Sequence, residues 1–347
     1  MTSLAHLFLL LSTLITVANA LAATTTPKSY LVTGANKGQG LALCQRILTE
    51  HPADTTTHVF LCGRDVQRGE DAKKKLLEEC GGSITEERVD VVQLDVTDQD
   101  SVKAALEKVQ NKLGKDGKLA GVVSNAGILW GYPLPDLMDV CATGVKRVLD
   151  AFVPLVEEDG RVVVVTSGLG PLMHSYAGKE RQAALMDAEN DGNDDTLAPM
   201  MEECLTAYKE STTIEERIAA FEQIEFPGGP FADTAPDFHM YGLAKMFGDA
   251  YMLRTAHLHP TLRVTSVDPG LVYTDLILKM PKYAGLAKEE TSAQSPEEGV
   301  EGTMRLLFDN DGVIGKGVGE GSGKLYALNK ERELVFSDIN RMPQKQE

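Results

Sequence analysis

Short apolar runs alternate with amphipathic stretches along most of the chain. The runs have the length of strands, and the stretches between them place apolar side chains at the spacing of a helix face. The valine run 162–165 indicates a strand buried on both faces, as in parallel sheets. The pattern predicts an α/β fold, a single domain with a Rossmann-like doubly wound parallel sheet. We expect strands at 29–32, 58–62, 89–94, 119–123, 161–166 and 262–267 and, at the edge of the sheet, 324–327.

Helices are expected between these strands. Residues 41–48 and 66–80 are amphipathic, and Asp98 precedes apolar residues at helical spacing, so it is expected to cap the next helix. Near the end of the chain, Ser295 is followed by a proline at the first position of a further predicted helix. Tyr241 is expected to begin the helix that precedes the sixth strand.

Residues 186–240 interrupt this alternation. They hold fourteen acidic side chains and two basic ones, and they supply most of the net charge of −17. Residues 187–195 are predicted to form a solvated loop, and the later part carries apolar residues at helical spacing. We expect an acidic insertion with one or two surface helices.

The composition excludes some classes of partner. With 34 basic against 51 acidic side chains, the chain offers no basic stripe for nucleic acid. Its five cysteines are scattered and form no paired motif, so neither a disulfide framework nor a metal site is expected.

The two ends are predicted to lie outside the folded domain, residues 28–330. An apolar run at 7–17 and the small residues of Ala18-Asn19-Ala20 are typical of a cleaved signal peptide, so residues 1–23 are set apart as a targeting segment. The run is short for a membrane span, and no stable span is expected in the mature chain. An uncleaved anchor or an organelle address stays open, as does a cytoplasmic location. Residues 331–347 are expected to be a C-terminal tail.

A glycine-rich turn follows the first strand and opens the first helix. Glycines allow a tight turn and let the backbone approach a pyrophosphate at the positive end of the helix. Its place between strand and helix predicts a dinucleotide-binding site. The turn reads Thr33-Gly34-Ala35-Asn36-Lys37-Gly38-Gln39-Gly40.

Charge at the end of the second strand indicates which dinucleotide is bound. A ribose 2′-hydroxyl is matched by a carboxylate there, whereas a 2′-phosphate needs cations. The strand ends at Arg64, and Lys37 of the glycine turn can approach the same place. Asp65 is the counter-argument, but we expect it to lie one step beyond the ribose. The predicted cofactor is NADP(H).

Later in the chain, three further residues indicate a proton-transfer reaction. Tyr241 and Lys245 are four residues apart, which places them on one face of a helix. A neighbouring ammonium favours the phenolate, so we expect Lys245 to lower the pKa of Tyr241. Ser167 follows the valine-rich strand, at the carboxyl end where ligand crevices form in this architecture.

The spacing of the glycine turn and the Ser, Tyr and Lys residues resemble the short-chain dehydrogenase/reductase family, and Thr-Gly-Ala-Asn-Lys-Gly is similar to its NADPH-dependent carbonyl reductases. The resemblance covers roughly residues 28–330. It implies that Ser167 hydrogen-bonds a substrate carbonyl, that Tyr241 donates the proton, and that Lys245 holds the ribose. The implied catalytic residues are Ser167, Tyr241 and Lys245.

Further positions match the same family. By resemblance, Asp95 lies beside the adenine, Asn125 supports the sheet where the cofactor passes, and the turn at 268–275 closes over the nicotinamide. The predicted cofactor-binding residues are Gly34, Asn36, Lys37, Gly38, Gln39, Gly40, Arg64, Asp95, Asn125, Ala126, Gly127, Tyr241, Lys245, Pro269, Gly270 and Thr274. Carbonyl reductases carry an insertion before the tyrosine that covers the helix face used by others to oligomerise, which implies a monomer.

Two features depart from the family pattern. Cys141 stands where many members carry an asparagine of the proton relay, and a thiol is a poor hydrogen-bond partner. The stretch between Gly127 and Cys141 is also shorter than usual, so we expect a trimmed helix and an open pocket wall. Gln39 is a milder change, since relatives usually carry a small apolar residue there.

These residues together predict an enzyme that reduces a ketone or aldehyde of a small molecule with NADPH. Two alternatives stay open. The same residues could oxidise an alcohol, as in alcohol or steroid dehydrogenases, or the chain could be a catalytically weak NADP-binding sensor or scaffold. The sequence does not identify the substrate.

Overall fold

The computed structural model describes residues 28–50, 57–187, 196–308, 323–328 and 334–337. Its centre is an eight-stranded sheet with the order β3-β2-β1-β4-β5-β6-β7-β8, in which β8 alone runs antiparallel to its neighbour. The strand order reverses between β1 and β4, which creates the crevice typical of doubly wound sheets. The strands are β1 (Ser29–Val32), β2 (His58–Gly63), β3 (Val89–Gln93), β4 (Leu119–Ser124), β5 (Val156–Val165), β6 (Arg263–Asp268), β7 (Lys324–Leu328) and β8 (Leu334–Ser337).

The predicted sheet is confirmed, with a difference at one edge. The strand expected at the edge, β7, is covered by β8, which pairs with it in antiparallel register. β8 comes from residues 331–347, which had been expected to form a tail. The predicted signal segment, residues 1–23, lies outside the described residues.

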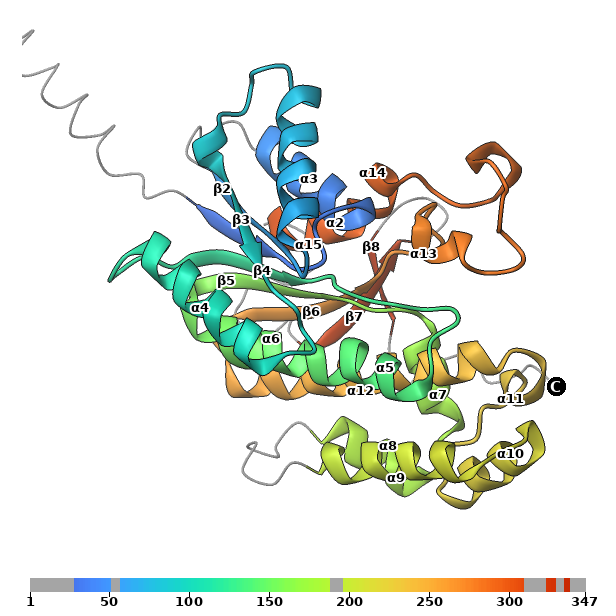
Figure 1. Ribbon diagram of the computed structural model, residues 1–347. Coiled ribbons are helices and arrows are strands. Elements are labelled where there is room, and N and C mark those ends of the chain that lie inside the picture. The colour runs from blue at the N-terminus through green and yellow to red at the C-terminus, as the bar shows by residue number, and fades with distance from the viewer. Residues whose placement is uncertain (1–27, 51–56, 188–195, 309–322, 329–333, 338–347) are drawn as a thin grey trace, which may run out of the picture.

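Helices cover both faces of the sheet (Figure 1). One face carries α2, α3, α14 and α15, and the other carries α4, α6 and α12. Asp98 caps α4 as predicted, since its side chain accepts from the amide of Asp100. The longer helices are α2 (Gly38–Glu50), α3 (Val66–Glu79), α4 (Gln99–Leu113), α6 (Gly144–Phe152), α7 (Leu169–Tyr176), α8 (Lys179–Met186), α9 (Leu197–Glu210), α10 (Ile214–Gln223), α12 (Pro236–Leu258) and α15 (Glu301–Phe308). The shorter ones are α5 (Leu134–Met138), α11 (Phe231–Thr234), α13 (Asp275–Leu278) and α14 (Pro296–Gly299).

The acidic insertion forms an additional layer below α12 (Figure 1). Its described part folds as α9, α10 and α11 and as the first residues of α12, while residues 188–195 of the expected loop lie outside the described residues. α9 and α10 bury apolar side chains such as Met200, Cys204 and Phe221 in a core shared with α12. α12 begins at Pro236, earlier than expected, and this second layer explains why it is buried on nearly all sides.

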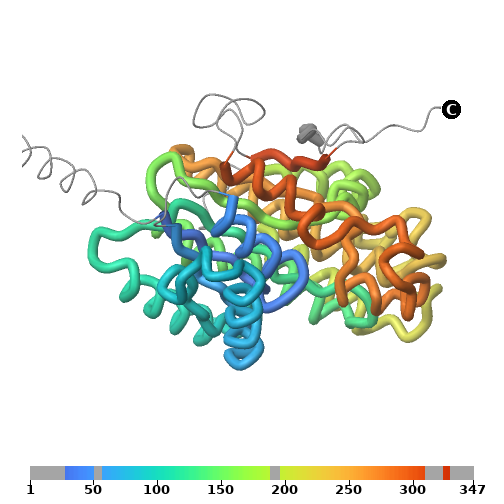
Figure 2. Tube along the Cα trace, turned by 90° about the horizontal axis from the view of Figure 1, so that it is seen from above, coloured from blue at the N-terminus to red at the C-terminus, as the bar shows by residue number. Residues whose placement is uncertain are grey.

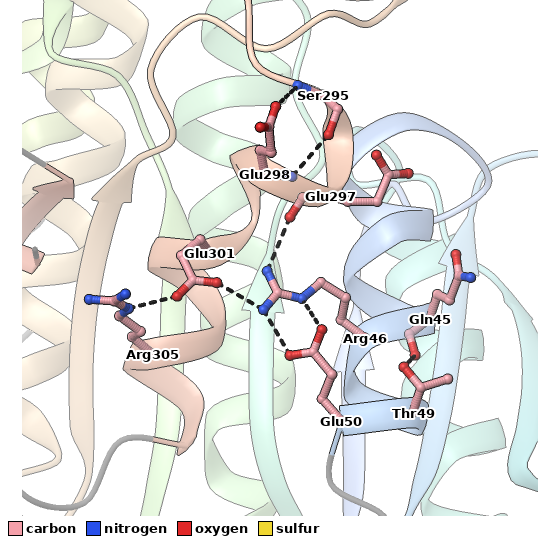
Figure 3. Close-up of polar contacts among 9 residues, drawn as sticks. All are labelled: Gln45, Arg46, Thr49, Glu50, Ser295, Glu297, Glu298, Glu301 and Arg305. Carbon is pink, nitrogen blue, oxygen red and sulfur yellow. Dashed lines mark hydrogen bonds and ion pairs between the residues drawn. The ribbon is translucent and has the colours of Figure 1, made fainter. Parts of the chain in front are cut away.

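A cluster of ion pairs joins the first helix to the last ones (Figure 3). Arg46 of α2 pairs with Glu50 on its own helix and, at 2.8 Å, with Glu301 of α15. Its guanidinium also donates to the carbonyl oxygen of Glu297 in α14 at 3.1 Å. α14 begins at Pro296 as predicted, and the Ser295 side chain caps it. The helix that begins with the glycine turn is therefore fixed to α14 and α15.

Figure 2 shows the molecule from above, with α2 and α3 in blue near its middle and the segment after β6 in orange to the right of them. Among the described residues, no helix combines the length and the apolar character needed to cross a bilayer.

Candidate functional site

The glycine turn has a backbone that other residues could not adopt. Gly34 has φ +64°, and a Cβ at this position would lie 2.9 Å from Cα of Ala126. A Cβ on Gly40 would lie 2.5 Å from the carbonyl oxygen of Gly34 and 2.7 Å from Nδ2 of Asn125. The turn therefore packs directly on the segment after β4, and two of its glycines are required by that contact.

Asn125 holds these two segments together. Its Nδ2 donates to the carbonyl oxygen of Thr33 at 2.9 Å, and its backbone N–H donates to the Thr33 hydroxyl at 2.9 Å. The same hydroxyl accepts from the backbone N–H of Ala126 at 3.0 Å. The carboxyl ends of β1 and β4 are thus joined at the point where the strand order reverses.

A cleft of about 550 Å³ opens at this switch point. Most of the predicted cofactor-binding residues line it, although Pro269, Gly270, Tyr241 and Lys245 do not. Those that do are Gly34, Asn36, Lys37, Gly38, Gln39, Gly40, Arg64, Asp95, Asn125, Ala126, Gly127 and Thr274. The remaining lining residues are Gly63, Arg68, Leu94, Val96, Thr97, Ile128, Tyr132, Val140, Tyr273, Asp275, Leu276, Leu278 and Lys279.

Two arginines lie at the β2 side of the cleft. Arg64 and Arg68 both line it and both are solvent-exposed. Asp65, which lies between them in sequence, is the N-cap of α3 and accepts from the backbone N–H of Arg68 at 3.0 Å. Its other oxygen pairs with the Arg68 guanidinium at 3.6 Å, so the carboxylate is engaged with the helix, and it is absent from the cleft lining. Arg68 was not singled out from the sequence, because only the helical turn after Asp65 brings it beside Arg64.

Lys37 lines the cleft and also has a partner within the chain. Its ammonium pairs with Asp275 at 2.6 Å, and both side chains are largely exposed. The contact joins the glycine turn to α13, which follows β6. Gly38 lies against the same segment, since a Cβ on it would be 3.2 Å from Cγ2 of Thr274. The two sides of the cleft thus meet above the glycine turn.

Asp95 belongs to a turn after β3. Its Oδ1 accepts from the backbone N–H of Thr97 at 3.0 Å and from the Thr97 hydroxyl at 2.7 Å. These bonds fix the carboxylate within the turn, where it borders the cleft together with Leu94 and Val96.

The opposite wall of the cleft carries aromatic side chains. Lys279 donates to the Tyr132 hydroxyl at 2.7 Å and lies 4.6 Å from the centre of its ring. Tyr273 lines the cleft as well and donates to the carbonyl oxygen of Leu286 at 2.8 Å. The contact between Lys279 and Tyr132 joins the segment after β4 to the segment after β6 at the place where an open wall had been expected.

Ser167, Tyr241 and Lys245 come together at the end of β5. Tyr241 is 7% exposed and Lys245 5%, so both are buried. The Lys245 ammonium lies 5.6 Å from the centre of the Tyr241 ring and donates to the carbonyl oxygen of Val165 at 2.8 Å. A Cβ on Gly127, a cleft residue, would lie 3.8 Å from that ammonium nitrogen. Lys245 thus lies next to the cleft, and Tyr241 and Ser167 lie beside it at the end of β5.

The pKa of Tyr241 moves in the direction opposite to the one expected. Burial raises it well above the ordinary value, and the nearby Cys141 and Asp268 raise it further. A hydrogen bond with Ser167 opposes this effect, while Lys245 is not among the causes. The expected lowering by Lys245 is therefore wrong for this arrangement, in which the ammonium is directed to Val165. The phenol carries its proton at neutral pH.

Cys141 lies in a turn of π-helix, Asp139–Thr143, between α5 and α6. It is fully buried, and its thiol approaches the carbonyl oxygen of Ile128 at 3.6 Å. α5, this turn and α6 follow one another without a break and form one continuous helix over residues 134–152. Irregular turns of this kind are frequent at functional sites.

Pro269 and Gly270 are not among the residues that line the cleft. Gly270 has φ +71°, and its backbone N–H donates to Oδ1 of Asp268 at 2.9 Å. Gln294 donates to the carbonyl oxygen of Pro269 at 3.2 Å. The turn therefore positions Tyr273 and Thr274, which do reach the cleft. Within the described residues, no group of three His, Cys, Asp or Glu side chains could hold a metal ion.

Comparisons with known proteins show which proteins the chain is similar to. Residues 28–179 match the family described as short chain dehydrogenase. The chain is 28% identical over 308 residues to a (+)-neomenthol dehydrogenase of Arabidopsis thaliana, with 82% of this chain and 92% of that protein covered.

Two solved structures share the fold at lower identity. Salutaridine reductase from Papaver somniferum aligns with a TM-score of 0.62 at 23% identity, over 82% of this chain and 97% of that one. An NADPH-bound carbonyl reductase from chicken fatty liver aligns with a TM-score of 0.53 at 18% identity, over 90% and 99%. Residues 28–179 thus match the short-chain dehydrogenase/reductase family, whose oxidoreductases use nicotinamide cofactors, and the chain resembles the carbonyl reductases of that family.

Proposed function

We propose that the protein reduces the carbonyl group of a ketone or aldehyde with NADPH. The observation that carries the proposal is the cluster at the end of β5, where the buried Tyr241 lies with Ser167 and with Lys245, whose ammonium approaches the dinucleotide-sized cleft at Gly127. Named relatives fit this chemistry, since they include a (+)-neomenthol dehydrogenase and a salutaridine reductase.

The arginines of the cleft support NADPH rather than NADH. Arg64 and Arg68 present two guanidinium groups beside the end of β2, and guanidinium groups bind phosphate with paired hydrogen bonds. Asp65, the carboxylate that would favour a free 2′-hydroxyl, is engaged at the N-terminus of α3. The glycine turn and the N-terminal end of α2 would hold the pyrophosphate.

Each residue of the cluster has a distinct role in the proposed reaction. When bound, the cofactor supplies a hydride to the carbonyl carbon. The Ser167 hydroxyl donates a hydrogen bond to the carbonyl oxygen and orients it toward Tyr241. Tyr241 then transfers its proton to that oxygen as negative charge develops there. The Lys245 ammonium, which donates to the carbonyl oxygen of Val165, would hold the ribose of the cofactor, as the family resemblance implies.

The test is NADPH oxidation by the full chain with a panel of reactive ketones and aldehydes. We expect activity that prefers NADPH to NADH and that is lost in Tyr241→Phe, a variant that keeps the ring and removes the transferable proton. Cofactor binding, followed by fluorescence, should be unchanged in this variant. Tight NADPH binding without turnover of any carbonyl would contradict the proposal.

One observation favours a second function, that of an NADP-binding sensor with weak turnover. Cys141 replaces an expected hydrogen-bonding side chain, and its thiol contacts only a carbonyl oxygen at 3.6 Å among the partners described for it. If this function applies, Cys141→Asn should raise turnover, whereas a full-rate reductase should gain nothing from it.

The insertion supports a monomer. α9 and α10 share a core with α12, so this helix is covered within its own chain (Figure 1). Light scattering coupled to gel filtration would test this proposal directly, with a dimer as the contrary result.

A further inference from the structure

Three consecutive residues at the end of β5 meet three side chains on one face of α12. The side chains are spaced four residues apart, so each belongs to the next turn of the helix. The third of them, Asp249, has no part in the proposed reaction. The pairs are Ser167 with Tyr241, Val165 with Lys245 and Thr166 with Asp249.

Asp249 is firmly held in this position. It is 4% exposed, and its Oδ2 accepts from the Thr166 hydroxyl at 3.0 Å. The first turn of α7 packs closely against it, because a Cβ on Gly170 would lie 2.6 Å from Oδ2. The carboxylate therefore lies between β5, α7 and α12 and has little room to move.

Other ionisable groups face this carboxylate from each neighbouring element. Lys245 lies one turn earlier on α12, and Asp268 ends the adjacent strand β6. On α7, His174 borders a small cavity of about 10 Å³ that Asp249 also borders. Burial lowers the pKa of His174, so this side chain is neutral at pH 7. Lys245 is thus the nearby cation whose charge opposes that of Asp249.

Burial raises the pKa of Asp249 to about 7, while the Thr166 hydroxyl and the Lys245 ammonium act in the opposite direction. The group therefore changes charge near neutral pH. Its negative charge in turn raises the pKa of Tyr241. The two groups are coupled through space, so a change at residue 249 is measurable at the tyrosine.

We propose that Asp249 is a positioning residue for the reaction, whose carboxylate ties the Thr166–Ser167 end of β5 to α12 and supplies the negative charge beside Tyr241 and Lys245. This inference rests on the proposed function for its effect on turnover. The contacts that carry it are independent of substrate and cofactor.

Loss of the Asp249 charge should change the pH dependence of the reaction in a defined direction. Without the negative charge, Tyr241 loses its proton more readily, so its ionisation moves to lower pH. Reduction requires the protonated phenol, and the alkaline limb of the kcat profile moves with it. The expected shift is about 0.5 to 1 pH unit, the scale of one nearby charge acting in a buried site. Wild type should also show a step in the kcat profile near pH 7, where Asp249 changes charge, and this step should be absent in Asp249→Asn.

The experiment compares Asp249→Asn, which keeps the shape and the hydrogen-bond acceptor, with wild type. Asp233→Asn, an exposed acidic residue on α11, is the control for loss of one charge. The kcat profile is measured across pH, and ionisation of Tyr241 is followed by tyrosinate absorbance. Parallel titrations in a Tyr241→Phe background isolate the signal of this tyrosine.

A lower tyrosinate midpoint in Asp249→Asn, absent in Asp233→Asn, supports the inference. Equal midpoints and equal kcat profiles in wild type and Asp249→Asn would overturn it. If wild type reduces no carbonyl, the proposed function fails, while the titration still decides the role of Asp249. Should Asp249→Asn not fold, Thr166→Val and Thr166→Ser replace it. A loss of kcat of at least tenfold in Thr166→Val but not in Thr166→Ser supports the inference. Equal kcat values in the two variants refute it.

Discussion

Replacing Arg64 and Arg68 together by alanine should weaken NADPH binding and leave NADH binding unchanged. Both side chains line the cleft beside the end of β2, and NADPH differs from NADH by a phosphate that needs cations. The variant removes both guanidinium groups without altering the glycine turn. Lys37 stays in place and keeps its ion pair with Asp275.

The size of the effect follows from the exposure of the two arginines. A hydrogen bond to a charged group contributes about 1.5 to 3 kcal/mol when it is shielded from water. Arg68 has 64% of its side chain exposed and Arg64 is exposed as well, so solvent screening reduces each contribution to about 1 kcal/mol. The two together amount to about 2 kcal/mol, which is about a thirtyfold increase in KM for NADPH.

The assay is steady-state kinetics with each cofactor at saturating substrate, supported by direct binding of NADPH. Lys74→Ala is the matched control, because it removes a positive charge from the same helix at a site that is 77% exposed and away from the cleft. A change in KM for NADPH of less than twofold in the double variant would refute the reasoning. So would an equal loss for NADH, which would indicate damage to the turn rather than loss of phosphate contacts.

Two further predictions concern packing and pH. Gly40→Ala places a Cβ 2.5 Å from the carbonyl oxygen of Gly34, so we expect a loss of about 1 to 3 kcal/mol in the free energy of unfolding and at least tenfold weaker NADPH binding. Gly63→Ala is the control, because its Cβ would meet Asn36 at an ordinary 3.6 Å. Equal melting temperatures of the two variants would contradict the argument. Burial lowers the pKa of His239 to about 4, so the folded state resists protonation and its stability falls as the pH drops below the ordinary pKa of 6.5. The His239→Gln variant should therefore lose less stability between pH 7 and pH 5 than wild type, as measured by urea unfolding. Equal losses in the two proteins would exclude this cause.

The sequence identified the elements that depend on local pattern. In the valine run of β5, burial on both faces limits each position to an apolar residue. In the glycine turn, positive φ angles and the close approach to Asn125 require glycine. β8 could not be located in the same way. Its pairing with β7 is a long-range contact, and four residues have no periodicity that distinguishes a strand from a tail.

The chemistry of the site was harder to predict than its location. The pKa of Tyr241 depends on burial and on Cys141 and Asp268, which come from distant parts of the chain. The sequence supplied only the neighbour four residues away, Lys245, and its ammonium turned out to be directed to a backbone carbonyl. Arg68 was missed for a related reason, since only the start of α3 brings it to the cleft.

The Arg46 cluster connects parts of the chain that are synthesised far apart in time. Arg46 and Glu301 are separated by 255 residues, yet their contact holds the helix that begins at the glycine turn (Figure 3). During translation α2 emerges first and has no partner at Glu297 or Glu301 until nearly the whole chain has left the ribosome. Contacts of such long range slow folding, because the loop between them must close before they stabilise anything. A nascent chain that ends before α14 would therefore expose part of α2. Full cofactor binding should appear only after α14 and α15 have been synthesised.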